Sequence, residues 1–381
     1  MSLRSKTKFW LRQFPFIYPG KVIHSCQKWI DDRRKHGGIY FNQRGPWYKV
    51  VLPGGAVHHN EPHTIGRADK KAFDYNRNYT FDPALLFYLP NSYVYGNKGI
   101  VLTSRHHIFE EFTHHFGISS LGKFLRKNPF YTFTKNFKKV AGVGAMLVSP
   151  QSHNYYHWLN DVLPRIRLYE PVLNSIDWFC ISSAVPAKFL EILPEFGIDT
   201  QKILLIGDKE KFHFDHLYVA SLPGSEGRSP DWASDFIRGK LIKKLPVAPA
   251  KKLYFKRGNG TGRKILNEDT IISTLQALGF DIIDPGSLSI YDQVDVVQSA
   301  KMVISAHGAA LSNLVFAQQH MAVIEIFSPD YFRTDCYYTL SSSLKLNYWY
   351  IAGNKPDGAN WGDIEVDEGL LIKTIEAADA R

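Results

Sequence analysis

Cysteine is scarce in this sequence of 381 residues, and long hydrophobic runs are absent. Cys26, Cys180 and Cys336 lie far apart and form no C-x-x-C pair, which argues against a disulfide framework and a structural zinc site. The start of the chain lacks the apolar stretch of a signal peptide, and nowhere do about 18 apolar residues follow one another. These absences predict a cytoplasmic protein without a membrane span.

Acidic residues are outnumbered, and most of the positive excess lies at the N-terminus. The formal net charge is +10, and residues 1–50 hold 11 Lys and Arg against two acidic residues. In the N-terminal segment 1–36, basic and aromatic side chains interleave over residues 1–20, which is typical of a peripheral contact with anionic lipid. A segment that docks on its own domain would show the same pattern. Charge alone does not separate lipid, nucleic acid and phosphate-bearing substrates.

The rest of the chain has an α/β pattern. Residues 37–146 are rich in short aromatic and β-branched runs, which predicts a strand-rich region. From residue 140 apolar strands alternate with amphipathic helices, which predicts parallel sheets. A linker at 246–250 divides this alternation, so we expect an α/β domain at 37–245, a Rossmann-like domain at 246–350, and a tail with a helix at 351–381. The predicted strands are 145–149, 178–182, 203–206, 216–220, 252–255, 281–284, 302–305 and 322–327, and the predicted helices are 156–168, 186–196, 232–245, 268–278, 291–298, 309–316 and 368–378.

The segment MVISAHGAALSNLVF, residues 302–316, combines a strand, a turn of small residues and a helix. Backbone N–H groups at the start of that helix would face the carboxyl edge of the sheet, where phosphate binds readily. The pattern is not G-x-G-x-x-G, which argues against a nicotinamide dehydrogenase. A tight turn capped by a histidine is the structural alternative. The candidate binding residues are Ser305, His307, Gly308, Ala309 and Ala310.

A second phosphate-binding candidate is the glycine-rich segment KRGNGTGRK after strand 252–255. Lys256, Arg257 and Arg263 surround its glycines, and a guanidinium group offers two parallel donors to a phosphate. The spacing is not that of a Walker loop, and a solvated hairpin is the alternative. Glu325, in strand 322–327, is a candidate for a contact with ribose hydroxyls or for an ordinary ion pair.

An acid–base candidate lies in SHNYYHWLNDVLPRIRLYE, where His153, His157, Asp161 and Arg165 recur every four residues. On one helix His157, Asp161 and Arg165 would share a face, so His157 and Asp161 can form a pair in which one is the base and the other orients it. A polar stripe with an Asp161–Arg165 ion pair is the alternative. No third ligand accompanies the two histidines, and the acidic segment 363–367 is expected to lie away from the site, so we expect no metal.

Together, HNYYHWLNDVLPRI, KRGNGTGRKILNE and SAHGAALSNLVFA resemble glycosyltransferase family 61, over roughly residues 145–330. Its members include plant xylosyltransferases, animal N-acetylglucosamine transferases and bacterial proteins of capsular polysaccharide synthesis. The resemblance implies a GT-B-like architecture of two Rossmann-like domains facing across a cleft, an inverting mechanism and a nucleotide-sugar donor. By position, it implies that Arg257, Arg263 and the turn 307–309 bind the donor's diphosphate, with His157 and Asp161 opposite.

We therefore expect a metal-independent glycosyltransferase that uses a nucleotide sugar as co-substrate and no further cofactor. Its acceptor would be a hydroxyl of a glycan or lipid-linked glycan in surface or capsular polysaccharide synthesis, with a possible membrane contact through residues 1–20. The rival classes are a nucleic-acid-binding protein and a non-catalytic protein that binds sugars or nucleotides. No zinc finger, helix-turn-helix or RNP-like pattern accompanies the positive charge, so we expect no nucleic acid partner.

Overall fold

The chain forms two compact units, and each unit combines two separate stretches of sequence. The computed structural model describes residues 22–36, 45–66, 70–112, 136–224, 227–244, 248–257 and 263–381, so the predicted membrane contact at 1–20 lies outside the described residues. Unit 1 comprises 1–53 and 83–222, and unit 2 comprises 54–82 and 223–381. The division thus falls at other residues than the predicted linker at 246–250. In the described ranges, every helix is too short or too polar to cross a membrane.

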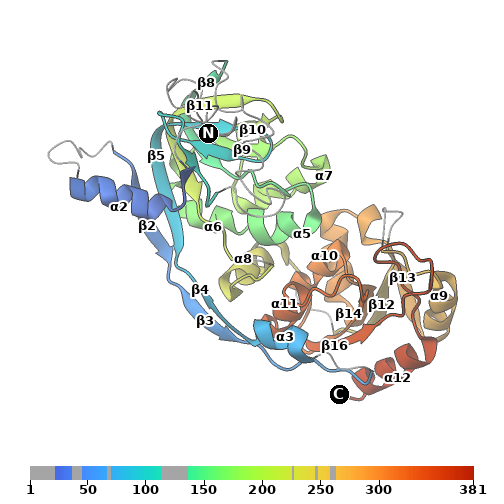
Figure 1. The fold of residues 1–381 in the computed structure, drawn as a ribbon. Helices are drawn as coiled ribbons and strands as arrows, with labels where there is room; N and C mark the ends of the chain where they lie inside the picture. Colours follow the sequence, from blue (N-terminus) through green and yellow to red (C-terminus); the bar gives the residue numbers. More distant parts are fainter. Residues whose placement is uncertain are drawn as a thin grey trace. The chain divides into compact units, whose positions relative to one another are not determined.

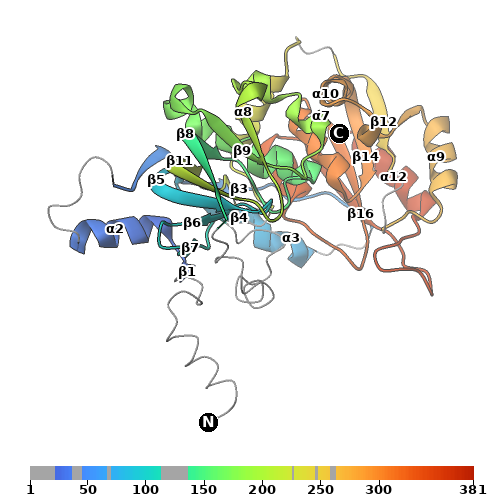
Figure 2. The ribbon, with the colours of Figure 1, turned by 90° about the horizontal axis from the view of Figure 1, so that it is seen from above.

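A mixed sheet lies at the centre of unit 1 (Figure 2). In the described part of the chain its strands follow the order β1-β7-β6-β5-β11-β8-β9-β10, and β2 also pairs with β5. The strands β8, β9, β10 and β11 are parallel, as the alternating pattern predicts, whereas β5 joins β11 in antiparallel orientation. Their bounds are β1 (Val22–Ile23), β2 (Trp47–Leu52), β5 (Ala84–Tyr95), β6 (Ile100–Leu102), β7 (Ile108–Phe109), β8 (Lys138–Met146), β9 (Trp178–Ser182), β10 (Ile203–Ile206) and β11 (Lys211–Ala220).

The helix α2 (Cys26–His36) contributes Cys26 and Ile30 to the core of unit 1, where they join Phe87, Leu89 and Phe109 of the sheet. All five side chains are buried. The other helical segments in the described part of this unit are short: α5 (Tyr155–His157), η2 (Trp158–Val162), α6 (Arg165–Tyr169), η3 (Glu170–Ser175), α7 (Ala187–Leu190), η4 (Leu193–Phe196) and η5 (Thr200–Lys202).

The helix predicted at 156–168 is divided into α5, the π-helical turn η2 and α6. The Leu163 N–H bonds to the Trp158 carbonyl at 3.0 Å, five residues back, and Pro164 has no N–H to continue the ladder. The extra residue in this turn changes the angular position of the residues that follow. The expectation that Arg165 shares a face with His157 and Asp161 is therefore wrong.

Arg165 is buried, and its guanidinium bonds to backbone carbonyls at the sheet of unit 1. Its guanidinium donates to the carbonyls of Met146 at 2.8 Å, Val148 at 3.2 Å and Ala220 at 3.2 Å. Met146 and Ala220 are the last residues of β8 and β11, and Val148 lies two residues beyond β8. Burial lowers the pKa of Arg165, and the nearby phenol of Tyr169 and carboxylate of Asp161 oppose that effect.

The sheet of unit 2 consists of parallel strands in the order β13-β12-β14-β15-β16, among the described residues. All six residues of β15 are buried, as expected for a parallel sheet covered on both faces. The helices α9 and α12 lie beside this sheet (Figure 1). Their Leu275 and Leu371 pack against Tyr254 and Ile304 in one core cluster. The strands are β12 (Lys251–Phe255), β13 (Phe280–Ile283), β14 (Ala300–Ala306), β15 (Ala322–Phe327) and β16 (Asn347–Ala352), and the helical segments are α8 (Asp231–Leu241), α9 (Glu268–Ala277), η6 (Pro285–Ser287), α10 (Ile290–Gln298), η7 (Ala309–Phe316), α11 (Tyr337–Ser343) and α12 (Glu368–Asp379).

Residues 54–82 add a hairpin and a helix to unit 2: β3 (Gly55–His58), β4 (Asn78–Phe81) and α3 (Lys70–Arg77). The ring of Phe73 in α3 packs 4.6 Å from that of Tyr350 and 5.0 Å from that of Tyr338.

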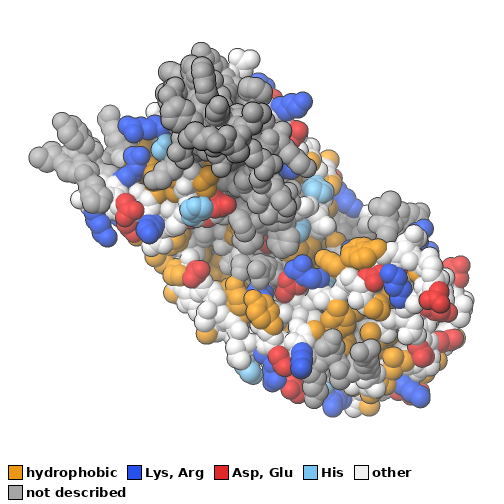
Figure 3. Space-filling model, in the orientation of Figure 1, with side chains coloured by type: hydrophobic (Ala, Val, Ile, Leu, Met, Phe, Trp, Pro, Cys, Tyr) orange, Lys and Arg blue, Asp and Glu red, His pale blue; other side chains and the backbone are white. Residues whose placement is uncertain are grey.

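On the face of unit 2 seen in Figure 3, acidic and basic side chains are interspersed. The described surface in that view therefore carries no continuous basic stripe of the kind that binds nucleic acid.

We expect Arg165→Met to lower the free energy of unfolding by about 2–4 kcal/mol, because buried carbonyls lose their donor at about 1–3 kcal/mol each. Arg167→Ala, two residues along α6, is the matched control. Arg167 is half exposed and pairs with Glu170, so its loss should cost less than about 1 kcal/mol. Urea unfolding followed by circular dichroism measures the free energy of unfolding of each variant. Equal losses of stability in the two variants would show that the hydrogen bonds of Arg165 to the sheet do not stabilise the fold.

Candidate active site

The strand order of unit 2 places a topological switch point between β12 and β14. Numbered along the chain, its strands run 2-1-3-4-5, so the connections after β12 and β14 leave in opposite directions. Open α/β sheets bind ligands in the crevice that this creates at the carboxyl ends of the two strands. Lys256 and Arg257 follow β12, and His307 and Gly308 follow β14. The structure thus brings both predicted phosphate-binding segments to one edge.

Arg257 joins the two segments directly. Its Nη1 donates to the His307 carbonyl at 2.8 Å. A Cβ on Gly308 would lie 3.3 Å from that nitrogen, so the missing side chain leaves room for the guanidinium. Burial, followed by the positive charge of Arg263, lowers the pKa of Arg257. Two cationic groups therefore share this edge of the sheet.

The backbone of Arg263 has an unfavourable conformation. It has a φ of +57°, which is unfavourable for a residue with a side chain. Its Nη1 is buried without a hydrogen-bond partner among the described residues, and its guanidinium lies 4.7 Å from the ring centre of Tyr331. Gly362, with a φ of +82°, passes beneath it: a Cβ there would lie 2.3 Å from the Arg263 Cγ. Strain and an unsatisfied buried donor together are typical of a functional site.

The side chain of His307 is fixed by a buried carboxylate. Its Nδ1 lies 2.5 Å from Oε1 of Glu325, and the Tyr348 hydroxyl donates to Oε2 at 2.5 Å. Burial, then the negative charge of Glu325, raises the pKa of Tyr348 well above its ordinary value, so this hydroxyl stays protonated. Glu325 is fully buried, with both oxygens engaged. It is therefore placed to orient His307, while its contact with a ribose stays a prediction.

The remaining predicted binding residues lie at the same edge. Lys256 is exposed directly after β12, and Ala309 and Ala310 form the start of η7. The segment η7 has its predicted bounds, although it is a 3₁₀ helix, and its first N–H groups have no carbonyl within the helix to bond. The hydroxyl of Ser305 is buried and donates to the Phe255 carbonyl at 3.3 Å and to the Ala306 carbonyl at 3.1 Å. Ser305 thus joins β12 to β14.

The acidic segment 363–367 lies beside this site, and the expectation that it is remote was wrong. The Lys264 N–H donates to the Asp363 carboxylate at 2.6 Å, and Ile364 forms a β-bridge with Ile265. The backbone donor of Lys264 is the main cause that lowers the pKa of Asp363. Within the described ranges, no group of His, Cys, Asp and Glu has the arrangement of a metal site.

The arginines leave little empty space between them. A hollow of about 10 Å³ is lined by Arg257, Arg263, His307, Tyr331 and Gly362, with neighbouring residues. That volume holds about one water molecule. A larger anion must therefore lie on the outer side of the guanidinium groups or displace them.

In unit 1, the structure brings together the predicted acid–base residues His157 and Asp161. The Nδ1 of His157 lies 2.6 Å from Oδ2 of Asp161, with side-chain exposures of 12% and 20%. A carboxylate in this position holds the imidazole in one tautomer and orientation. His153 lies in the preceding turn and is exposed.

Sequence reasoning missed four contributors in unit 2: Tyr331, Tyr348, Gly362 and Asp363. Tyr348 belongs to β16, which the sequence pattern did not predict. Tyr331, Gly362 and Asp363 belong to irregular segments that carry no periodic signal. The dipeptide Trp361-Gly362 was the one local sign of a special turn.

The fold and these side chains define an α/β protein with two neighbouring arginines, Arg257 and Arg263, at the switch point of a parallel sheet. Comparison with known families agrees with that class: residues 155–324 match the family described as Glycosyltransferase 61. The match confirms the resemblance that the motifs predict. The matched region contains His157, Asp161, Arg257, Arg263 and His307 and ends one residue before Glu325.

The chain is also similar to a curated plant protein, the alpha-1,3-arabinosyltransferase XAT3 of Oryza sativa subsp. japonica. The two are 35% identical over 89 residues. This stretch is 23% of the present chain and spans only 15% of the length of the rice protein.

We expect Gly362→Ala to weaken binding of pyrophosphate at least about tenfold, because the new Cβ displaces Arg263 and one charge-assisted contact is lost. Gly358→Ala is the matched control. Gly358 has a similar φ of +76° but nothing within 4 Å of its would-be Cβ, so backbone strain is comparable and the steric conflict is absent. Calorimetric titration distinguishes them, and equal affinities would show that the position of Arg263 is irrelevant.

Proposed function

We propose that this chain is a glycosyltransferase that binds the diphosphate of a nucleotide-sugar donor at Arg257 and Arg263 in unit 2. The supporting observation is the pair of cations at the switch point, because the buried Nη1 of Arg263 has no hydrogen-bond partner among the residues that the structure describes. The family match over residues 155–324 supports a transferase of sugars rather than another nucleotide-binding protein.

The proposed chemistry needs charge neutralisation at the leaving diphosphate. Arg257, Arg263 and the N–H groups at the start of η7 would bind the phosphate oxygens, so no metal ion is required for that step. A preorganised cationic site costs no reorganisation when negative charge develops. His307, oriented by Glu325, would contact the diphosphate or the sugar beside it.

Transfer also needs a group that takes the proton of the acceptor hydroxyl. We assign this role to the pair of His157 and Asp161, in which one member is the base and the other orients it. Direct attack by the acceptor on the anomeric carbon would invert its configuration. The proposal includes the GT-B-like architecture of two Rossmann-like domains that the resemblance to the family implies.

The acceptor in this proposal is a hydroxyl of a glycan or lipid-linked glycan, with capsular or other surface polysaccharide as the product. The interleaved basic and aromatic residues of segment 1–20 favour a peripheral membrane contact. The rice relative is named as an arabinosyltransferase, which favours a sugar as the transferred group.

The direct test is a panel of nucleotide sugars, with donor hydrolysis and calorimetric binding of the corresponding nucleotides as readouts. We expect at least one donor to be hydrolysed, and Arg263→Ala to lower kcat/KM for it by about 100-fold or more. Lys251→Ala removes a charge from the opposite end of β12, where Lys251 lies 3.6 Å from Asp281, and should leave turnover unchanged. A fully active Arg263→Ala variant would show that the donor binds elsewhere.

Activity should persist in excess EDTA, because the cationic side chains neutralise the leaving group. The measurement is the rate of donor turnover before and after chelation, and again after adding manganese or magnesium. Loss of turnover in EDTA with recovery on adding metal would refute the metal-independent mechanism.

Asp161→Asn and His157→Gln should each reduce turnover by at least about 100-fold, the lower end of general-base contributions, while donor affinity is retained. The matched control is His153→Gln. His153 is an exposed histidine one turn earlier, and its substitution should leave turnover unchanged. If both pair variants keep near-normal turnover, the pair is structural and the base lies elsewhere.

A further inference from the structure

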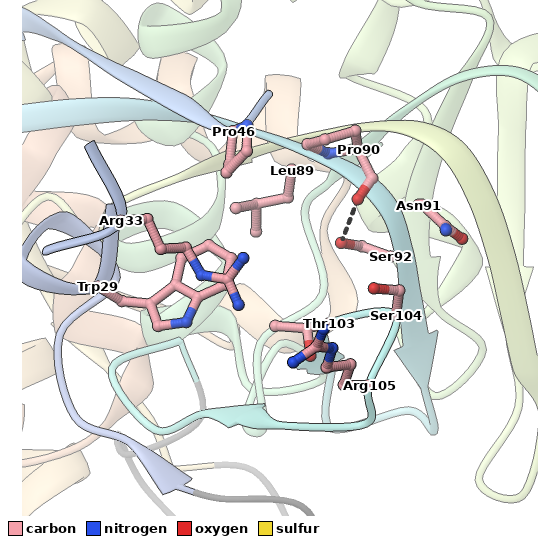
Figure 4. Close-up of a pocket in the computed structure, with 10 residues that line it drawn as sticks. All are labelled: Trp29, Arg33, Pro46, Leu89, Pro90, Asn91, Ser92, Thr103, Ser104 and Arg105. Atoms are coloured by element: carbon pink, nitrogen blue, oxygen red, sulfur yellow. Dashed lines mark hydrogen bonds between the residues drawn. The ribbon is translucent and has the colours of Figure 1, made fainter. Parts of the chain in front are cut away.

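Unit 1 contains a pocket that the proposed donor site and the His157–Asp161 pair do not use. Its volume is about 290 Å³, and it lies between α2, the strand β5 at 89–92 and the turn 103–105 that follows β6 (Figure 4). All of its lining residues belong to unit 1. The volume is at the lower end of small-molecule sites and suits a single sugar unit.

Two guanidinium groups line this pocket, and none of its lining residues in the described ranges carries a carboxylate. Arg33 comes from α2 and Arg105 from the turn after β6, and Figure 4 shows both beside the same hollow. In the part of the chain that the structure describes, neither forms an ion pair or a hydrogen bond with another residue. Burial, followed by the positive charge of Arg105, lowers the pKa of Arg33. Asp31, two residues earlier on α2, accepts hydrogen bonds from Tyr48.

The guanidinium of Arg33 is held in place by an aromatic stack. Its Cζ lies 4.2 Å from the ring centre of Trp29, and Trp29 in turn packs edge-on against buried Phe109 at 5.2 Å. The cation–π contact reduces the entropy that Arg33 would lose on binding an anion. A cation fixed in this way, with a second cation beside it, is poised for an oxyanion.

Neutral hydrogen-bonding groups also line the pocket, and two of them, Thr103 and Ser104, lie beside Arg105 (Figure 4). Ser92, Thr103 and Ser104 line the pocket together with Asn91, whose Oδ1 lies 2.6 Å from Nε2 of His213. Hydroxyl and amide groups beside a cationic pair match the mixture of hydroxyls and one negative charge on an acidic sugar. A bare inorganic anion would leave most of them unused.

We propose that this pocket binds a sugar that carries a phosphate or a carboxylate, with Arg33 and Arg105 as the ligands of the oxyanion. Such a sugar occurs as a sugar phosphate, including the headgroup of a lipid-linked glycan, or as a uronic acid within a glycan. The proposal does not depend on the donor site, because the pocket lies entirely within unit 1.

The test is calorimetric titration of the full chain carrying Arg257→Ala and Arg263→Ala, which removes the other candidate phosphate site. The probes are glucose 1-phosphate, glucuronate, inorganic phosphate and neutral glucose. We expect one or both acidic sugars to bind more tightly than glucose and inorganic phosphate. Glucose 1-phosphate alone would identify a phosphate-bearing ligand, and glucuronate alone would identify a uronic acid.

In that background Arg33→Gln and Arg105→Gln should each weaken binding about ten- to hundredfold, as expected for a lost hydrogen bond to a charged group. Arg34→Gln is the matched control: it is the next residue of α2, lies over the ring of Tyr48 and does not line the pocket. Circular dichroism verifies that each variant is folded. Absence of binding by both acidic sugars at millimolar concentration, or equal affinity in all three variants, would overturn the proposal.

Discussion

Two neighbouring guanidinium groups at the carboxyl edge of a parallel sheet are the constraint on which the proposed site depends. Arg257 donates to a main-chain carbonyl, and the buried Nη1 of Arg263 has no partner among the described residues. Partly buried like charges repel each other and lose hydration, so the arrangement is unfavourable until an anion arrives. Binding a diphosphate would satisfy both groups at once.

The surrounding residues keep these cations in position. Gly308 and Gly362 lack the side chains that would displace Arg257 and Arg263. On the same edge, Glu325 is fully buried and fixes His307. Because that carboxylate is bonded to His307 and Tyr348, it is placed to orient the imidazole. A small number of backbone and carboxylate positions thus determine the shape of the anion site.

Local sequence patterns predicted much of this structure. The strands 178–182, 203–206 and 322–327 and the helical segment 309–316 have their predicted bounds, because short apolar runs and adjacent turn residues define them. The helix at 156–168 was mispredicted, since periodicity does not reveal a π-helical turn before Pro164. The grouping of 54–82 with unit 2 depends on tertiary contacts such as that of Phe73 with Tyr350, which no local pattern encodes.

In the candidate site too, local sequence predicted some residues, and others depend on tertiary contacts. Arg257 and Arg263 were recognised because glycines and arginines cluster in one short segment beside a strand end. The roles of Asp363 and Gly362 could not be predicted, because they lie about a hundred residues further along and reach the site through the bridge of Ile265 with Ile364. The carboxylate of Glu325 was placed correctly on its strand, but its partners depend on β16.

The central claim is that Arg257 and Arg263 bind the diphosphate of the donor. A crystal structure of the full chain with a bound nucleoside diphosphate tests it most directly. We predict phosphate oxygens within hydrogen-bond distance of both guanidinium groups and of the N–H groups at the start of η7. A diphosphate bound elsewhere, with the two arginines unchanged, would contradict the account.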